Sequence, residues 1–187
     1  MNRLFIAFIA ISIASCQGSS DSTTNNSLWT FSPKNNQVSF DNACQPLILS
    51  YQDVLKGVQA ADTAYVYEAA KKLVLLTDSF PTINNSNDTV FNNNLKQGLV
   101  NINAEAQGLL FETNWPEIYK ATNMISIQLI HLLGEAGYKQ HTIYIFNTPT
   151  NVQEDNFIWF SFLKTTRDPY HPSNKEGVVA QQILQEH

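Results

Sequence analysis

Apolar residues recur every three or four positions along four stretches of the chain, a spacing that places them on one face of an α-helix. The stretches begin at Pro46, Asp62, Phe91 and Asn114, and short polar or turn-forming segments separate them. Asp62 is a residue type that caps helix N-termini, and the Asn-Trp-Pro-Glu sequence from Asn114 has capping-box spacing. Four amphipathic helices with short connections predict an antiparallel four-helix bundle.

After the fourth helix the pattern changes to that of β-strands. Residues 143–146 and 157–162 are rich in β-branched and aromatic side chains, and a polar connector containing proline separates them, which predicts a β-hairpin capping the bundle. Residues 173–183 contain capping-box spacing and then Val179 and Ile183 one helical turn apart, which predicts a short helix. The expected fold is mainly α (α+β): an antiparallel four-helix bundle capped by a C-terminal β-hairpin and a short helix.

The start of the chain has a separate organisation. Arg3 precedes an apolar run that is too short to span a membrane and that ends in Ile-Ala-Ser before Cys16. This predicts a signal peptide over residues 1–15, and the Ile-Ala-Ser-Cys sequence resembles the lipobox of bacterial lipoproteins, which implies acyl chains such as palmitate on Cys16. The alternative is an ordinary cleaved signal in which Cys16 has no role. Residues 16–40 are rich in Ser, Thr and Asn and predict a flexible tether before a single domain over residues 41–187.

The net charge of the chain argues against one class of partner, nucleic acid. The formal net charge is -5 and the sequence pI is about 5.2, so the chain lacks the basic surface that binding to phosphate backbones requires. Nucleic acid is therefore not expected as a partner. Only 14% of the residues are charged, and the many neutral polar residues are typical of a protein outside the cytoplasm.

Three short motifs in the second half share the spacing of a known family. Thr148-Pro149-Thr150 is followed eleven residues later by Trp159-Phe160-Ser161, and nine residues after that by Asp168-Pro169-Tyr170. With the helical body before them, the chain resembles the domain of unknown function 3347 family, found in envelope lipoproteins and in periplasmic subunits of heavy-metal efflux systems. The resemblance covers about residues 49–170. It implies a motif frame made of these residues: Thr148, Pro149, Trp159, Ser161, Asp168, Pro169 and Tyr170.

The chain departs from this family at the sulfur positions. The family has Cys-Pro-Met where this chain has Thr148 and Thr150 around the proline, and no Met or Cys follows Tyr170. Sulfur ligands select soft ions such as Cu(I). The resemblance therefore implies a divergent member that keeps the shape-forming residues and lacks the family's soft metal ligands.

Other side chains offer an alternative set of metal ligands. Cys44 is the second of the two cysteines, His141 precedes the first strand, and His171 follows the last motif. Together with Asp155 or Asp168 they would suit copper or zinc. The opposing interpretation is a packed thiol and two surface histidines, because the sequence contains no closely spaced histidine pair to fix a geometry.

Two further clusters have a plain and a functional interpretation. Ser161, Asp168 and His171 are the residue types of a hydrolase triad, but no Gly-x-Ser-x-Gly elbow surrounds Ser161, so we expect no enzyme. The aromatic residues of the hairpin either complete the core or leave rings exposed as a partner surface.

These observations predict a non-enzymatic lipoprotein of the cell envelope, anchored to the membrane through Cys16 and acting as a binding or interaction module. The expected partner is an envelope protein at the aromatic hairpin, and no resident cofactor is expected. The alternative is a periplasmic copper- or zinc-binding carrier of an efflux system. Gln17 is not the acidic residue associated with retention at the inner membrane, which favours the outer membrane.

Overall fold

The computed structural model of the chain describes residues 38–83, 88–148, 156–171 and 178–183. These ranges contain four helices and three strands, in this order: α1 (Val38–Gln59), α2 (Thr63–Asp78), α3 (Thr89–Leu109), α4 (Trp115–Ala136), β1 (Ile143–Asn147), β2 (Ile158–Ser161) and β3 (Val178–Ile183). The prediction of a mainly helical fold with a small antiparallel sheet is confirmed. No helix in these ranges is long and apolar enough to cross a membrane. The predicted signal peptide, Cys16 and Pro149 lie outside the described residues.

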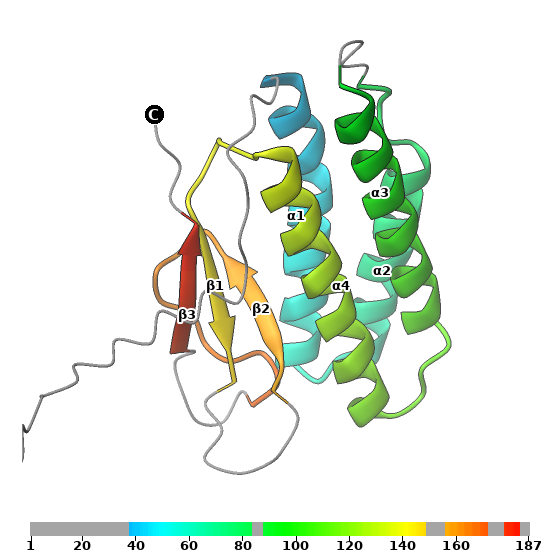
Figure 1. The fold of residues 1–187 in the computed structure, drawn as a ribbon. Coiled ribbons are helices and arrows are strands. Elements are labelled where there is room, and N and C mark those ends of the chain that lie inside the picture. The colour runs from blue at the N-terminus through cyan, green and yellow to red at the C-terminus, as the bar shows by residue number, and fades with distance from the viewer. Residues whose placement is uncertain (1–37, 84–87, 149–155, 172–177, 184–187) are drawn as a thin grey trace, which may run out of the picture.

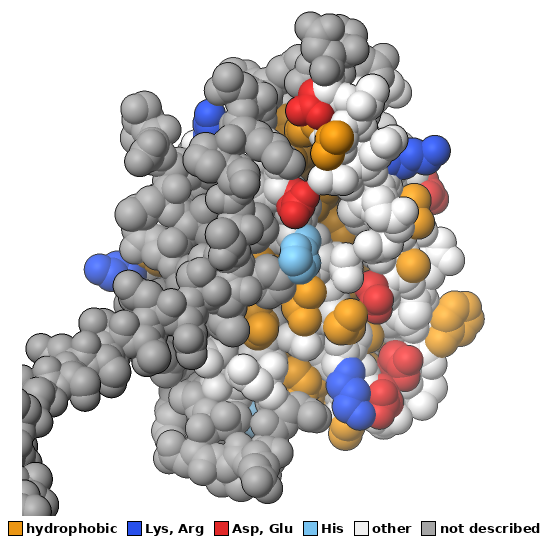
Figure 2. Space-filling model, in the orientation of Figure 1, with side chains coloured by type: hydrophobic (Ala, Val, Ile, Leu, Met, Phe, Trp, Pro, Cys, Tyr) orange, Lys and Arg blue, Asp and Glu red, His pale blue; other side chains and the backbone are white. Residues whose placement is uncertain are grey.

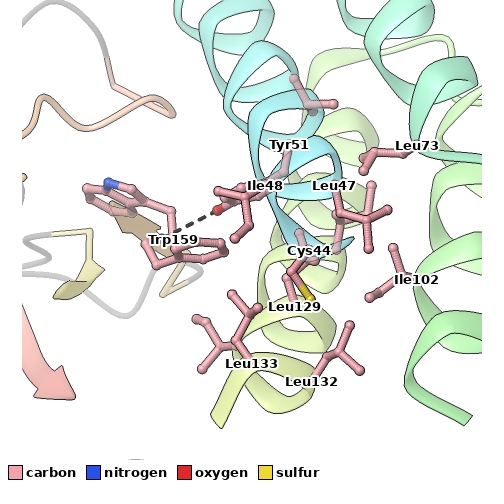
Figure 3. Packing of buried hydrophobic residues seen from close by; sticks show 14 of the residues in the cluster. Cys44, Leu47, Ile48, Tyr51, Leu73, Ile102, Leu129, Leu132, Leu133 and Trp159 are labelled. Carbon is pink, nitrogen blue, oxygen red and sulfur yellow. Dashed lines mark hydrogen bonds between the residues drawn. The ribbon is translucent and has the colours of Figure 1, made fainter. Parts of the chain in front are cut away.

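The four helices lie side by side (Figure 1). Contacts join α1 to α2, α2 to α3 and α3 to α4, and α4 also contacts α1. Their buried side chains form one core, in which Figure 3 shows residues of all four helices converging. Those labelled there include Leu47 of α1, Leu73 of α2, Ile102 of α3 and Leu129 of α4.

Local hydrogen bonds explain where three of the helices begin. Asp62 accepts the backbone N–H of Tyr65 at 3.0 Å, and Asn114 accepts that of Glu117 at 3.2 Å. Each cap satisfies one of the N–H groups that a helix N-terminus leaves without a partner in the helix. Both predicted caps are confirmed, and Asp88 caps α3 in the same way.

The first helix begins earlier than predicted. Its first residue is Val38, so the helix includes the end of the predicted tether and continues through Pro46. Phe40 is fully buried against Phe91 of α3, and the Asp41 carboxylate accepts the backbone N–H of Lys139. Packing of these additional turns, about two, outweighs the helix-breaking tendency of an internal proline.

The sheet has the strand order β2-β1-β3, and both pairings are antiparallel. The predicted hairpin is present, with Phe146 of β1 opposite Trp159 of β2. Figure 1 shows the sheet beside α1 and α4, and β2 contacts α4 directly.

The predicted C-terminal helix is wrong, because residues 178–183 form β3. Val179 and Ile183 are one helical turn apart, but so short a segment with β-branched residues fits either structure. Pairing with β1 decides between them, since it supplies partners for the backbone groups along the second edge of that strand. The Ser-x-x-Glu spacing before it lies outside the described residues.

Candidate functional site

The candidate site is the motif frame together with the parts of α1 and α4 that contact it. Its first described member, Thr148, closes the hairpin. The backbone N–H of this buried residue donates to the carbonyl of Phe157 at 2.9 Å, and its hydroxyl donates to the same oxygen at 3.3 Å. The side chain of Thr148 is therefore used in a contact with the backbone.

Asp168 organises the end of the frame. Its carboxylate is only 1% exposed and accepts the backbone N–H of Tyr170 at 2.9 Å, which forms a local turn of the type that aspartate favours. The second oxygen lies 3.2 Å from Nδ1 of His171. His171 is exposed, so the pair joins a buried carboxylate to a surface imidazole.

A tyrosine of α1 connects the sheet to the helices. The hydroxyl of Tyr51 shares a hydrogen bond of 2.7 Å with Ser126 of α4 and accepts the backbone N–H of Phe160, as Figure 3 shows for the latter. The rings of Tyr51 and Phe160 stack with centroids 4.7 Å apart. Complete burial raises the pKa of Tyr51 well above its ordinary value, so the hydroxyl stays protonated and supports the β2 edge.

A second link joins β2 to α4. Oδ1 of Asn123 accepts the backbone N–H of Ile158 at 2.7 Å. Neither Tyr51 nor Asn123 was predicted from the sequence as a site residue. Tyr51 occupies an apolar helix position in the pattern, and no sequence signal pairs either side chain with a strand that follows far later in the chain.

The aromatic residues of the hairpin mostly complete the core. Phe146, Trp159, Phe160 and Tyr170 are buried, and the rings of Phe146 and Trp159 stack 5.6 Å apart. Tyr170 packs edge-on against Trp159. Half-buried rings remain at Tyr144 and Phe162. Of the two interpretations of the hairpin aromatics, core or partner surface, most of these rings therefore fit the core.

The predicted metal ligands occupy different environments. Cys44 is 0% exposed in the core, where burial and the nearby Asp41 carboxylate raise the pKa of its thiol well above its ordinary value. His141 is exposed beside Phe162, and His171 is bound to Asp168. Within the described ranges no group of three or more His, Cys, Asp or Glu side chains comes close enough to hold a metal ion.

The triad residue types are not assembled as a triad in the described part of the chain. Ser161 Oγ accepts the backbone N–H of Leu163 at 3.0 Å, which fixes the turn after β2. Asp168 and His171 interact, but no hydrogen bond joins His171 to Ser161 among these residues.

Beside the frame lies a pocket of about 390 Å³, which we call the β2 pocket. It is bounded by the C-terminal half of α1 and by residues 159–169, and Trp159, Ser161 and Pro169 of the motif frame contribute to its wall. Two other hollows lie between α2 and α3, about 680 Å³, and between α3 and α4, about 340 Å³. Figure 2 shows the face of α3 and α4, where apolar side chains and charges of both signs are interspersed.

Comparison with known proteins adds no relative. No protein-family model, no curated protein and no solved structure matches this chain.

Proposed function

We propose that the protein is a non-enzymatic binding module of the cell envelope, anchored through lipid on Cys16 and related to the domain of unknown function 3347 family. The proposal includes the finer architecture: an antiparallel four-helix bundle whose α1 and α4 side carries the hairpin.

One observation carries the binding role: three polar side chains of the motif frame are engaged with the protein backbone. Thr148, Ser161 and Asp168 each hydrogen-bond a main-chain group of the hairpin or of the segment after it. Groups used in this way shape a surface and are not held ready for proton transfer or nucleophilic attack, which require a base within hydrogen-bonding reach of the nucleophile. The frame therefore acts as a support for the adjacent β2 pocket.

The anchoring half of the proposal rests on the Ile-Ala-Ser-Cys sequence. More than one acyl chain on one residue gives stable membrane attachment, because each buried methylene contributes about 0.8 kcal/mol. We expect wild-type protein in the membrane fraction, labelled by a fatty-acid analogue, and we expect Cys16→Ala to abolish the labelling and release the protein. Cys44→Ala is the matched control and should stay labelled. Labelling that survives in Cys16→Ala would contradict the lipid anchor.

The non-enzymatic half is tested with a panel of ester substrates. Any hydrolysis should be equal in wild-type protein and in Ser161→Ala, because Ser161 Oγ is used by the turn after β2. A signal that Ser161→Ala and His171→Ala both remove, with the fold intact by circular dichroism, would show that the protein is an enzyme.

A further inference from the structure

The hollow between α3 and α4, which we call the α3/α4 groove, has an apolar floor. Phe91, Leu95 and Leu132 are buried side chains that line it, and Ile127 is half-buried beside them. All of its lining residues come from these two helices. A groove with such a floor suits the large apolar side chains of a peptide segment, because their burial removes apolar surface from water.

The rim of the groove is polar and offers hydrogen bonds to a peptide backbone. Its amide side chains are those of Asn94, Gln97, Asn101 and Gln128. Two bonds join the helices here: Asn94 donates to Glu135 at 2.8 Å, and Asn101 donates to Gln128 at 3.2 Å. An amide side chain has two N–H donors and an acceptor oxygen, which is more than these bonds use. A segment lying along the groove therefore meets donors and acceptors for its main chain.

The chain enters the fold beside this groove. Val38 is the first residue of α1, and two residues later the ring of Phe40 packs edge-on against Phe91, with centroids 6.0 Å apart. Asp41 accepts the backbone N–H of Lys139, just after the end of α4, at 3.2 Å. The start of α1 is thus fixed against both helices of the groove. Among the described residues, the larger hollow between α2 and α3 has none from α4 in its wall.

The segment before α1 contains a group of apolar residues that can reach the groove. In residues 17–37 the large apolar side chains are Leu28, Trp29 and Phe31, surrounded by Ser, Thr and Asn. Phe31 lies seven residues before α1, a distance that an extended chain spans up to about 25 Å. The part of α3 that lines the groove, residues 91–101, is about 15 Å long. The linking residues are therefore long enough for docking anywhere along it.

The charges of the groove and of this segment are complementary. Glu135 lines the groove, and among the described residues no Lys or Arg does. Partial burial lowers the pKa of His131, another rim residue, so its imidazole is neutral at pH 7. Lys34 is the one charged residue of positions 22–37 and lies four residues before α1. Its ammonium group can approach Glu135 at the end of the groove where the chain enters.

We propose that the α3/α4 groove is the docking site for residues 28–31 of this same chain, with the rings of Trp29 and Phe31 on the apolar floor. Docking itself does not depend on the lipid anchor. Combined with an anchor on Cys16, it leaves residues 17–27 between the lipid and the domain and shortens the average tether from about 25 Å to about 18 Å. The docked segment thus holds the binding module closer to the membrane.

The test is photo-crosslinking in the whole protein, purified as the cell produces it, with the photoreactive residue benzoylphenylalanine in place of Thr30. This position leaves both neighbouring aromatic residues intact. Adducts formed in dilute solution are mapped by mass spectrometry. We expect adducts within one chain, joining this segment to the peptides of α3 and α4 that line the groove. Adducts spread over the surface, or confined to another face, would overturn the proposal. So would adducts between two chains, because the occupant would then be a second copy.

Two kinds of variant test the contact from both sides. Trp29→Ser should abolish the α3/α4 adduct without disturbing the bundle, because Trp29 is not one of the buried residues of the described core. Ile127→Gln should lower the adduct yield, whereas Leu75→Gln, at an exposed apolar residue of α2 outside the groove, should leave it unchanged. An adduct that survives unchanged in Trp29→Ser would also contradict the proposal. None of these results bears on Cys16 labelling, so the docking and the anchor fail independently.

Discussion

Tyr51 is the single residue on which the packing of the hairpin most depends. Its hydroxyl contacts Ser126 and the backbone of Phe160, so it connects α1, α4 and β2. Tyr51→Phe keeps the stacked ring but leaves the buried N–H of Phe160 unpaired. We expect a loss of about 1–3 kcal/mol in the free energy of unfolding, measured with denaturant at pH 7. Tyr65→Phe, at an exposed ring, should change it by less than about 0.5 kcal/mol.

Burial of tyrosine side chains should make the folded protein less stable at alkaline pH. The pKa values of Tyr51 and Tyr170 are raised in the folded protein, so above about pH 10 the unfolded chain loses protons that the folded chain keeps. The unfolded state then binds fewer protons, and the free energy of unfolding falls as the pH rises. We expect phenolate absorbance from these residues only on unfolding, and a shallower alkaline decline in Tyr51→Phe. A wild-type decline no steeper than that of the variant would contradict this assignment.

The thiol of Cys44 should be unreactive in the folded protein. Its thiol is fully buried and its pKa is raised, so little thiolate forms near neutral pH and reagents cannot reach it. In protein carrying Cys16→Ser, a thiol reagent should modify Cys44 only at the rate of unfolding. Rapid modification of the folded protein would show an accessible thiol and would favour a metal-binding role.

At the scale of elements, the junction of α1 and α2 depends on a glycine. A Cβ placed on Gly57 would lie 2.9 Å from the backbone nitrogen of Val66, so one of the helices would have to move. We expect Gly57→Ala to lower the free energy of unfolding by about 1–3 kcal/mol despite the better helix propensity of alanine. Gly108→Ala, in the last turn of α3 with no atom within 4 Å of its Cβ, should raise it by about 0.5–1 kcal/mol. Stabilisation by both variants would mean that α1 and α2 do not approach this closely.

Elements with strong local signals could be predicted from the sequence. Asp62 and Asn114 cap their helices by contacts within three residues, so local sequence contains the whole interaction. Two errors have a different origin. The first turn of α1 depends on Phe91 and Lys139, and β3 depends on pairing with β1, so both are decided by residues far away in the chain.

At the scale of the whole molecule, the candidate site also could not be predicted in full from local sequence. The sequence did not predict the roles of Thr148, Ser161 and Asp168, because these depend on the hydrogen bonds that the folded hairpin and the segment after it provide. Lys56 and Arg167 both line the β2 pocket but lie far apart in sequence. Nothing in the hydrophobic pattern associates them with Trp159, which also lines it. The β2 pocket is therefore a property of the tertiary packing.

The central claim, a binding module whose frame supports a pocket and does not hold a metal, is tested most directly by calorimetric titration of reduced copper under anaerobic conditions. The full-length protein carrying Cys16→Ser is compared with a variant that also carries Cys44→Ser, His141→Ala and His171→Ala. Our account predicts no stoichiometric binding by the first protein beyond that of the second. Tight stoichiometric binding that the additional substitutions abolish would contradict it and would identify a metal carrier.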